Sequence, residues 1–103
     1  PQLLWGKRIE LLSDLVGRPL RRLAWLGNPG NTSGEANWAD ARDAAARFGN
    51  ELNRINVSAA DDIDRAFDGL KDRDALLVPY DFLLSPESRR VAALAAERRL
   101  PAR

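Results

Sequence analysis

The sequence predicts an α/β domain in which helices cover both faces of a small parallel sheet. Residues 23–26 (LAWL) form an apolar run that is too short for a buried helix and is typical of a strand covered on both faces. Residues 75–78 (ALLV) form a second run of the same kind. Segments with helical periodicity separate these runs, and this alternation indicates parallel strands joined by crossover helices.

Composition narrows the possible functions. The 103 residues are enough for one domain, and the chain starts at Pro1 without a methionine, so we expect a piece of a longer protein. With 16 basic and 15 acidic residues the net charge is +1, which argues against nucleic-acid binding. There is no cysteine or histidine, and this excludes disulfides, thiol or histidine catalysis and nearly every zinc site. We therefore expect a protein that is not an enzyme and holds neither a cofactor nor a metal.

The first half of the chain reads as helix, strand and helix. Helical spacing of Trp5, Ile9, Leu12 and Val16, joined by Leu11 and Leu15, predicts an amphipathic helix over residues 5–16. Gly17 and Pro19 end it, and the first strand follows over residues 22–27. A second helix is predicted over residues 34–48, with an apolar face formed by Trp38, Ala41, Ala45 and Phe48.

The second half adds two strands and two helices. Residues 51–58 alternate between polar and apolar, which favours an edge strand, and Asp61 is the expected cap of a helix bearing Ile63, Ala66, Phe67 and Leu70. The acidic residues in the first turn of this helix are better explained by a favourable interaction with the helix dipole than by a metal site. The continuous hydrophobicity of residues 75–78 favours a central strand. Residues 85–87 (SPE) predict a helix start, and residues 100–102 (LPA) predict the entrance to another strand.

An edge-like second strand beside two apolar strands implies the order 2-1-3. The chain then reverses direction between the carboxyl ends of strands 1 and 3, where open α/β sheets bind ligands. Thr32 and Glu35 have the spacing of a capping box, so a helix N-terminus is expected at the same edge.

The residues after these two strands are the candidate binding site. Asn28, Asn31, Thr32 and Ser33 offer neutral donors and acceptors, Asp81 offers a counter-charge to an ammonium group, and Tyr80 or Phe82 offers a stacking surface. The alternative is that Asn28 and Ser33 only close the turn and that Asp81 caps a loop.

Several functional motifs do not fit. Gly27, Gly30 and Gly34 match neither the dinucleotide fingerprint nor the phosphate-loop pattern. A receiver domain needs acidic residues after the first strand, where this chain has Asn28 and Pro29. A serine hydrolase needs a base such as histidine to activate its serine, and this chain has no histidine.

Five segments, taken in order, resemble one protein family: residues 7–12 (KRIELL), 22–31 (RLAWLGNPGN), 58–62 (SAADD), 74–81 (DALLVPYD) and 95–102 (AAERRLPA). They are similar to the substrate-binding proteins of ABC transporters, in the tryptophan/tyrosine transport group. The resemblance spans nearly the whole chain but only one lobe of a two-lobed protein. It implies a three-layer, Rossmann-like α/β lobe of the type I periplasmic-binding-protein fold, here residues 1–103.

The resemblance also implies a function. It implies capture of a small amino-acid-like solute between two lobes, delivery to an ABC permease, and a periplasmic or other extracytoplasmic location. A sensory ligand-binding domain of the same fold and a small α/β enzyme are the alternatives. An open edge on the third strand leads us to expect a homodimer of the fragment.

Overall fold

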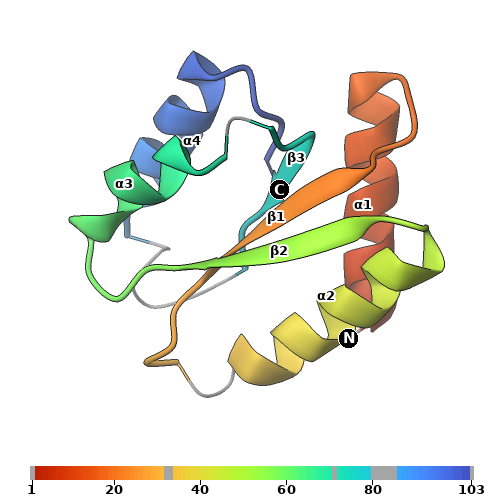
Figure 1. Ribbon diagram of the computed structural model, residues 1–103, viewed down its shortest axis with the longest axis horizontal. Coiled ribbons are helices and arrows are strands. Elements are labelled where there is room, and N and C mark those ends of the chain that lie inside the picture. The colour runs from red at the N-terminus through yellow and green to blue at the C-terminus, as the bar shows by residue number, and fades with distance from the viewer. Residues whose placement is uncertain (1, 32–33, 71, 80–85, 103) are drawn as a thin grey trace.

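The computed structural model describes residues 2–31, 34–70, 72–79 and 86–102. Helices and strands alternate along the described chain, and Figure 1 shows them as three layers, with helix pairs on the two faces of one sheet. The elements are α1 (Gln2–Val16), β1 (Arg22–Gly27), α2 (Gly34–Arg47), β2 (Glu51–Asn56), α3 (Asp62–Asp68), β3 (Ala75–Leu77) and α4 (Ser88–Glu97).

The sheet has the predicted topology. Its three strands are parallel in the order β2-β1-β3, so β2 is an edge strand as its alternation predicted. Register pairs Trp25 of β1 with Arg54 of β2 on one side and with Leu77 of β3 on the other. Along β1, Arg22 is exposed and the next five residues are buried. β1 is therefore the centre of the described sheet.

Alternation along β1 divides the core between the two faces of the sheet. Leu23 and Trp25 pack against α1 and α2, whereas Ala24 and Leu26 pack against α3 and α4. The face toward α1 and α2 is filled by Trp5, Ile9, Leu12, Ala41, Ala44, Ala45, Ala75 and Leu77. The opposite face is filled by Val57, Ile63, Ala66, Phe67, Leu70, Leu76, Val91, Ala95 and Leu100. Both cores depend on β1, because every second side chain of a strand points to the same face.

Some predicted details are wrong. Leu11 and Leu15 are exposed rather than part of the buried stripe of α1, and Phe48 is exposed just beyond the end of α2. The cap of α3 is not the Asp61 carboxylate. Instead, Asp62 accepts the backbone N–H groups of Ser58 at 3.0 Å and Ala59 at 3.1 Å. Arg65 also donates to this carboxylate.

The last two segments also differ in part from prediction. α4 begins at Ser88, after a turn that includes Pro86 and Glu87, so its predicted start was too early. β3 ends at Leu77, one residue earlier than predicted, and is the last of the three strands in the predicted order 2-1-3. Beyond β3, Ala102 forms a parallel bridge with Leu76, and the Leu76 N–H donates to the Pro101 carbonyl at 2.8 Å. This bridge confirms the predicted strand entrance at residues 100–102.

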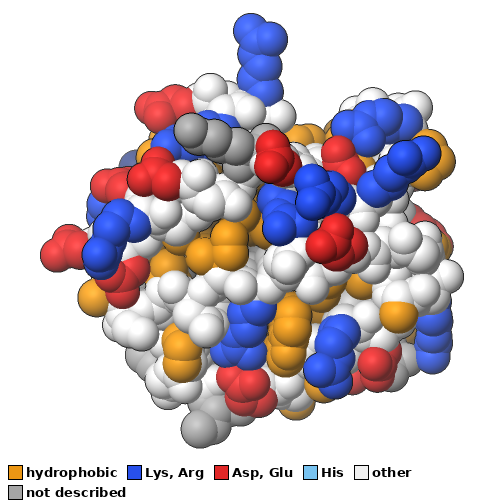
Figure 2. Space-filling view, viewed as in Figure 1, with side chains coloured by type: hydrophobic (Ala, Val, Ile, Leu, Met, Phe, Trp, Pro, Cys, Tyr) orange, Lys and Arg blue, Asp and Glu red, His pale blue; other side chains and the backbone are white. Residues whose placement is uncertain are grey.

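None of the described helices is long and apolar enough to cross a membrane. Figure 2 shows acidic and basic side chains interspersed over the face that it presents, with apolar patches between them.

Candidate functional site at the carboxyl edge of the sheet

The carboxyl ends of β1 and β3 lie side by side. Because the strands are parallel and Trp25 pairs with Leu77, the chain leaves β1 at Asn28 and β3 at Val78 on the same edge of the sheet. Val78 is partly buried and Pro79 is buried. This is the edge at which the sequence placed the candidate site.

Asn28 organises the turn that leaves β1. Its side chain is 8% exposed, and its Oδ1 accepts the Gly30 N–H at 3.0 Å. The Asn28 carbonyl accepts the Asn31 N–H at 3.0 Å, and the Asn31 carbonyl accepts the Gly34 N–H at 3.0 Å. These bonds link the residue that follows β1 to the first residue of α2. Asn28 therefore does close the turn, as one of the two interpretations of this residue required.

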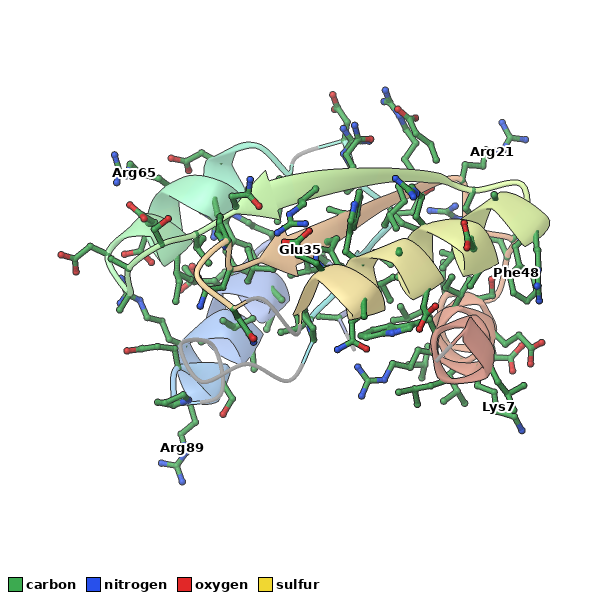
Figure 3. All side chains as sticks on the ribbon, turned by 90° about the horizontal axis from the view of Figure 1, so that it is seen from below. Lys7, Arg21, Glu35, Phe48, Arg65 and Arg89 are labelled. Carbon is green, nitrogen blue, oxygen red and sulfur yellow. The ribbon has the colours of Figure 1, made fainter. Side chains whose placement is uncertain are left out.

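An arginine on β2 holds the start of α2 in place, and no motif or spacing in the sequence indicates this contact. Arg54 donates from Nη1 and Nη2 to both carboxylate oxygens of Glu35, at 3.0 and 2.7 Å. Figure 3 shows Glu35 at the beginning of α2, beside β2. The hydrogen bond from Arg54 lowers the pKa of Glu35. Bidentate pairing of this kind fixes direction as well as distance, so we name Arg54 and Glu35 the β2–α2 clamp.

The clamp occupies the space beside the end of β1. Arg54 Nε donates to Asn56 Oδ1 at 2.6 Å, and the guanidinium carbon lies 5.5 Å from the centre of the Trp38 ring. A Cβ on Gly27 would lie 2.8 Å from Arg54 Nε. Arg54 of the clamp therefore leaves no room for a side chain on the last residue of β1, which is glycine.

Arg8 reaches the same edge from α1. Its Nη1 donates to the Val78 carbonyl at 3.4 Å, and its guanidinium carbon lies 4.6 Å from the centre of the buried Trp5 ring. The contact joins residues that are 70 positions apart, so helical periodicity could not reveal it. The three-residue spacing of Trp5 and Arg8 indicates only that these two side chains lie on neighbouring turns of one helix.

The structure describes two of the six predicted ligand-binding residues. Asn28 and Asn31 lie together in the turn after β1. Thr32, Ser33, Tyr80 and Asp81 lie outside the described residues, as do Phe82 and the Thr32 half of the predicted capping box. In the described ranges, no group of three or more acidic, histidine or cysteine side chains is placed to hold a metal ion.

The surface hollows lie mainly elsewhere. One of about 460 Å³ is lined by Arg18, Pro19, Arg21, Arg22 and Asp74, at the amino ends of β1 and β3. Another of about 260 Å³ lies between α1 and the segment after α2, with Ile9, Glu10, Pro19 and Phe48 in its wall. Neither touches the carboxyl edge, where ligands of open α/β sheets bind.

Solved structures share this arrangement. The ligand-free, open form of CD0873, a substrate-binding protein with adhesive properties from Clostridium difficile, matches at a TM-score of 0.83 and 15% identity over 93% of this chain. A conserved domain protein from Vibrio cholerae matches at 0.84 and 15% over 95%. An ABC domain in complex with L-Trp from Streptococcus pneumonia matches at 0.81 and 14% over 95%.

In each of these three cases the present chain spans 33% of the solved chain, about one third of its length. No family model and no curated protein matches the sequence. At these identities the likeness shows the fold alone, and it confirms the predicted three-layer α/β lobe with the strand order 2-1-3.

Proposed function

We propose that this chain is a solute-binding lobe and that it holds a small amino-acid-like molecule at the carboxyl edge of its sheet. The observation that carries the proposal is the Asn28 turn. This turn leads from the end of the central strand into α2, next to the point where the chain leaves β3. Such a place between two parallel strands is where α/β folds bind ligands.

The chemistry of this edge suits a zwitterion. Backbone N–H groups at the start of α2 favour a carboxylate, and the β2–α2 clamp neutralises Glu35, which would otherwise repel one. Asp81 remains the predicted partner of the ammonium group, with Tyr80 as the predicted stacking surface. Thr32 and Ser33 complete the predicted polar lining.

We infer that the whole protein works as the extracytoplasmic substrate-binding component of an ABC importer. The chain spans one third of the solved structures, and one of these is an ABC domain with L-Trp bound. A second lobe would close over the solute, and the loaded protein would dock on a permease. Binding rather than catalysis is the proposed activity.

The test is a titration of the chain with L-Trp, followed by amide NMR. A single lobe makes only part of the contacts of a closed cleft, so we expect millimolar binding. Shifts should concentrate at Gly30, Asn31 and Gly34, while Gly17 and Gly49, at the ends of α1 and α2, stay unchanged. Tryptamine lacks the carboxylate and is the matched control.

Asp81→Ala tests the proposed contact with the ammonium group of the ligand, whereas tryptamine tests the proposed contact with its carboxylate. We expect this substitution to abolish the response to L-Trp, whereas Glu97→Ala on α4 should leave it intact. Shifts spread evenly over the surface, or equal responses to L-Trp and tryptamine, would contradict a carboxylate site at α2. Micromolar binding by this lobe alone would contradict the two-lobe model.

A further inference from the structure

The outer surface of α1 gathers the exposed apolar side chains of the molecule. Within the described residues, all of the exposed large apolar side chains lie on α1 or directly beside it: Leu3, Leu4, Leu11, Leu15 and Phe48. Leu3 is 75% exposed and Leu15 is 63% exposed. Apolar residues scattered singly over a surface are normal, whereas a contiguous patch marks an interaction site. The outer surface of α1 is such a patch.

A stripe of charged residues runs along the middle of this surface. It is formed by four residues that are spaced four, three and four positions apart: Leu3, Lys7, Glu10 and Asp14. The first three each precede a buried residue of α1 by two positions, which is about half a helical turn. The stripe therefore points away from the sheet. Within the described part of the chain, its three charged side chains have no ion-pair partner.

A row of leucines borders the stripe on the side toward β3. This leucine row consists of Leu4, Leu11 and Leu15, which are four, three and seven positions from Arg8. They therefore share its side of the helix. Arg8 donates to the Val78 carbonyl at 3.4 Å, which places this side of α1 next to the end of β3.

Two hollows border the stripe on the side toward α2. They measure about 260 and 190 Å³, and both are lined by Glu10 and Phe48. Figure 3 shows Lys7 and Phe48 on the same side of the molecule. The larger hollow lies beside Asp14, at one end of the stripe, and Leu3 stands at the other end. The stripe thus has a projecting apolar side chain at one end and a hollow at the other.

We propose that α1 is the interface of a symmetric homodimer, in which the α1 helices of two copies pack antiparallel across a two-fold axis. The occupant is a second copy because the order of charges along the stripe is self-complementary. An antiparallel arrangement centred between Lys7 and Glu10 sets Lys7 of each copy opposite Glu10 of the other. A parallel arrangement would set like charges opposite each other.

The same register matches the remaining features of the surface. Leu3 of one copy faces Asp14 of the other, beside the larger hollow. Asp14 then lies against the first turn of the second α1, where the helix dipole favours negative charge. Because this two-fold axis sets each flank against the same flank of the other copy, the leucine rows meet. Leu4 of one copy falls between Leu11 and Leu15 of the other, so charge and shape select the same register.

This interface is distinct from the outer edge of β3. Part of that edge is already occupied, since Ala102 bridges to Leu76 and the Leu76 N–H donates to the Pro101 carbonyl at 2.8 Å. The 15 residues of α1 span about 22 Å, so the contact is at the small end of the range for specific interfaces. We therefore expect a weak dimer, with a micromolar dissociation constant. The dimer does not require a bound solute.

Sedimentation velocity over a wide range of concentrations measures this dimer, with Lys7→Glu and Glu10→Lys as the variants. Each reversal sets like charges opposite each other at both symmetric contacts, so we expect the dissociation constant to rise about tenfold. In an equimolar mixture of the two variants, one copy carries two acids and the other carries two lysines. We expect a heterodimer of nearly the parental affinity. Arg89→Glu makes the same charge change on α4, far from α1 (Figure 3), and should leave the dimer unchanged.

Leu11→Ser tests the leucine row. Leu11 is 50% exposed in the single chain, so the substitution should change the thermal midpoint of the dilute monomer little. The same substitution removes apolar area from the middle of the leucine row, and we expect it to weaken the dimer.

Three results would overturn the proposal. A chain that stays monomeric at every concentration has no such interface. A dimer that both charge reversals leave unchanged uses another surface, such as the outer edge of β3. A mixture of Lys7→Glu and Glu10→Lys that associates no better than the separate variants shows that these two side chains do not face each other.

Discussion

Asp74 and Arg22 hold each other through two hydrogen bonds that join the starts of β1 and β3. The Arg22 N–H donates to Asp74 Oδ2 at 2.9 Å, and the Asp74 N–H donates to the Arg22 carbonyl at 2.7 Å. The same Oδ2 accepts the Arg21 N–H at 3.0 Å, while Oδ1 accepts from Arg18 Nη2 at 3.1 Å. One carboxylate therefore fixes the amino end of the sheet, opposite the candidate site.

Removing this carboxylate should lower stability strongly. We expect Asp74→Ala to reduce the free energy of unfolding by about 2 kcal/mol, because hydrogen bonds to a charged acceptor are lost and two strand-end N–H groups lose their partner. Asp74→Asn keeps an acceptor for those N–H groups and should cost less than half as much. Urea denaturation measures both. Arg18→Ala removes only the exposed partner and should cost less than about 1 kcal/mol, so a larger loss would show that the ion pair dominates.

Stability should fall on acidification. Backbone N–H groups, chiefly that of Arg22, lower the pKa of Asp74 from its ordinary value of 3.8. The Ser58 N–H lowers the pKa of Asp62, and Arg90 and Arg54 lower those of Asp64 and Glu35. A lowered pKa means that the unfolded chain binds protons first, so the stabilisation is complete above the unfolded value and is lost as the pH falls through the folded one.

Thermal midpoints measured from pH 7 down to about pH 2 check this expectation. We expect a plateau near neutrality, since the chain has no histidine, and a decline that begins at about pH 5. Asp74→Asn should make the acid decline shallower. An unchanged slope in that variant would mean that Asp74 does not carry the effect.

Two glycine-to-alanine substitutions should change stability in opposite directions. A Cβ on Gly27 would meet Arg54 Nε at 2.8 Å, and Arg54 is held by Glu35 and cannot easily move away. We expect Gly27→Ala to cost about 1–3 kcal/mol by overpacking. In α1, a Cβ on Gly6 would come no closer than 3.6 Å to Phe48, so Gly6→Ala should gain about 0.5–1 kcal/mol from helix propensity.

The double variant Gly27→Ala, Arg54→Ala tests the cause. If the clash with the clamp is the reason for the loss, the double variant should be more stable than the sum of the two single changes predicts. Strict additivity in chemical denaturation would place the cost of Gly27→Ala in the strand itself.

Two substitutions of Asn28 should separate turn closure from ligand binding. Asn28→Asp keeps the oxygen that accepts the Gly30 N–H but places a negative charge beside the proposed carboxylate site. We expect it to fold with nearly the stability of the parent chain and to lose the NMR response to L-Trp. Asn28→Ala should also lose the NMR response, and its free energy of unfolding should fall by about 1–3 kcal/mol because the Gly30 N–H loses its acceptor. A retained response in Asn28→Asp would move the ligand carboxylate away from this turn.

The parts of the fold that could be predicted are those encoded locally. The strand before Asn28 is apolar on both faces, whereas β2 is polar on one face. These two patterns are enough to predict the strand order 2-1-3. Helical periodicity locates α1 but does not give the width of its buried face. It therefore predicts Leu11 and Leu15 in the core, although only the side of the helix with Trp5 and Ile9 is buried. At α4, the local signal of Ser85 and Pro86 placed the helix start too early.

The contacts that could not be predicted are those between distant segments. Glu35 and Arg54 are 19 residues apart, and Arg22 and Asp74 are 52 apart. Charged residues are common on every exposed surface, so nothing in the sequence marks which acid meets which base until the strands are in register. Asn28 was predictable because both of its roles, turn closure and a place at the end of a strand, are local.

The indole rings of Trp5, Trp25 and Trp38 form a row across the core between the sheet and the helices α1 and α2. Their ring centres are 4.7 Å apart in the first pair and 5.9 Å in the second, with tilted planes. Chromophores this close couple electronically, so the native fold should carry a near-ultraviolet circular dichroism signature that belongs to the row as a whole. Loss of that signature reports separation of α1, β1 and α2 in a single optical measurement without any added label.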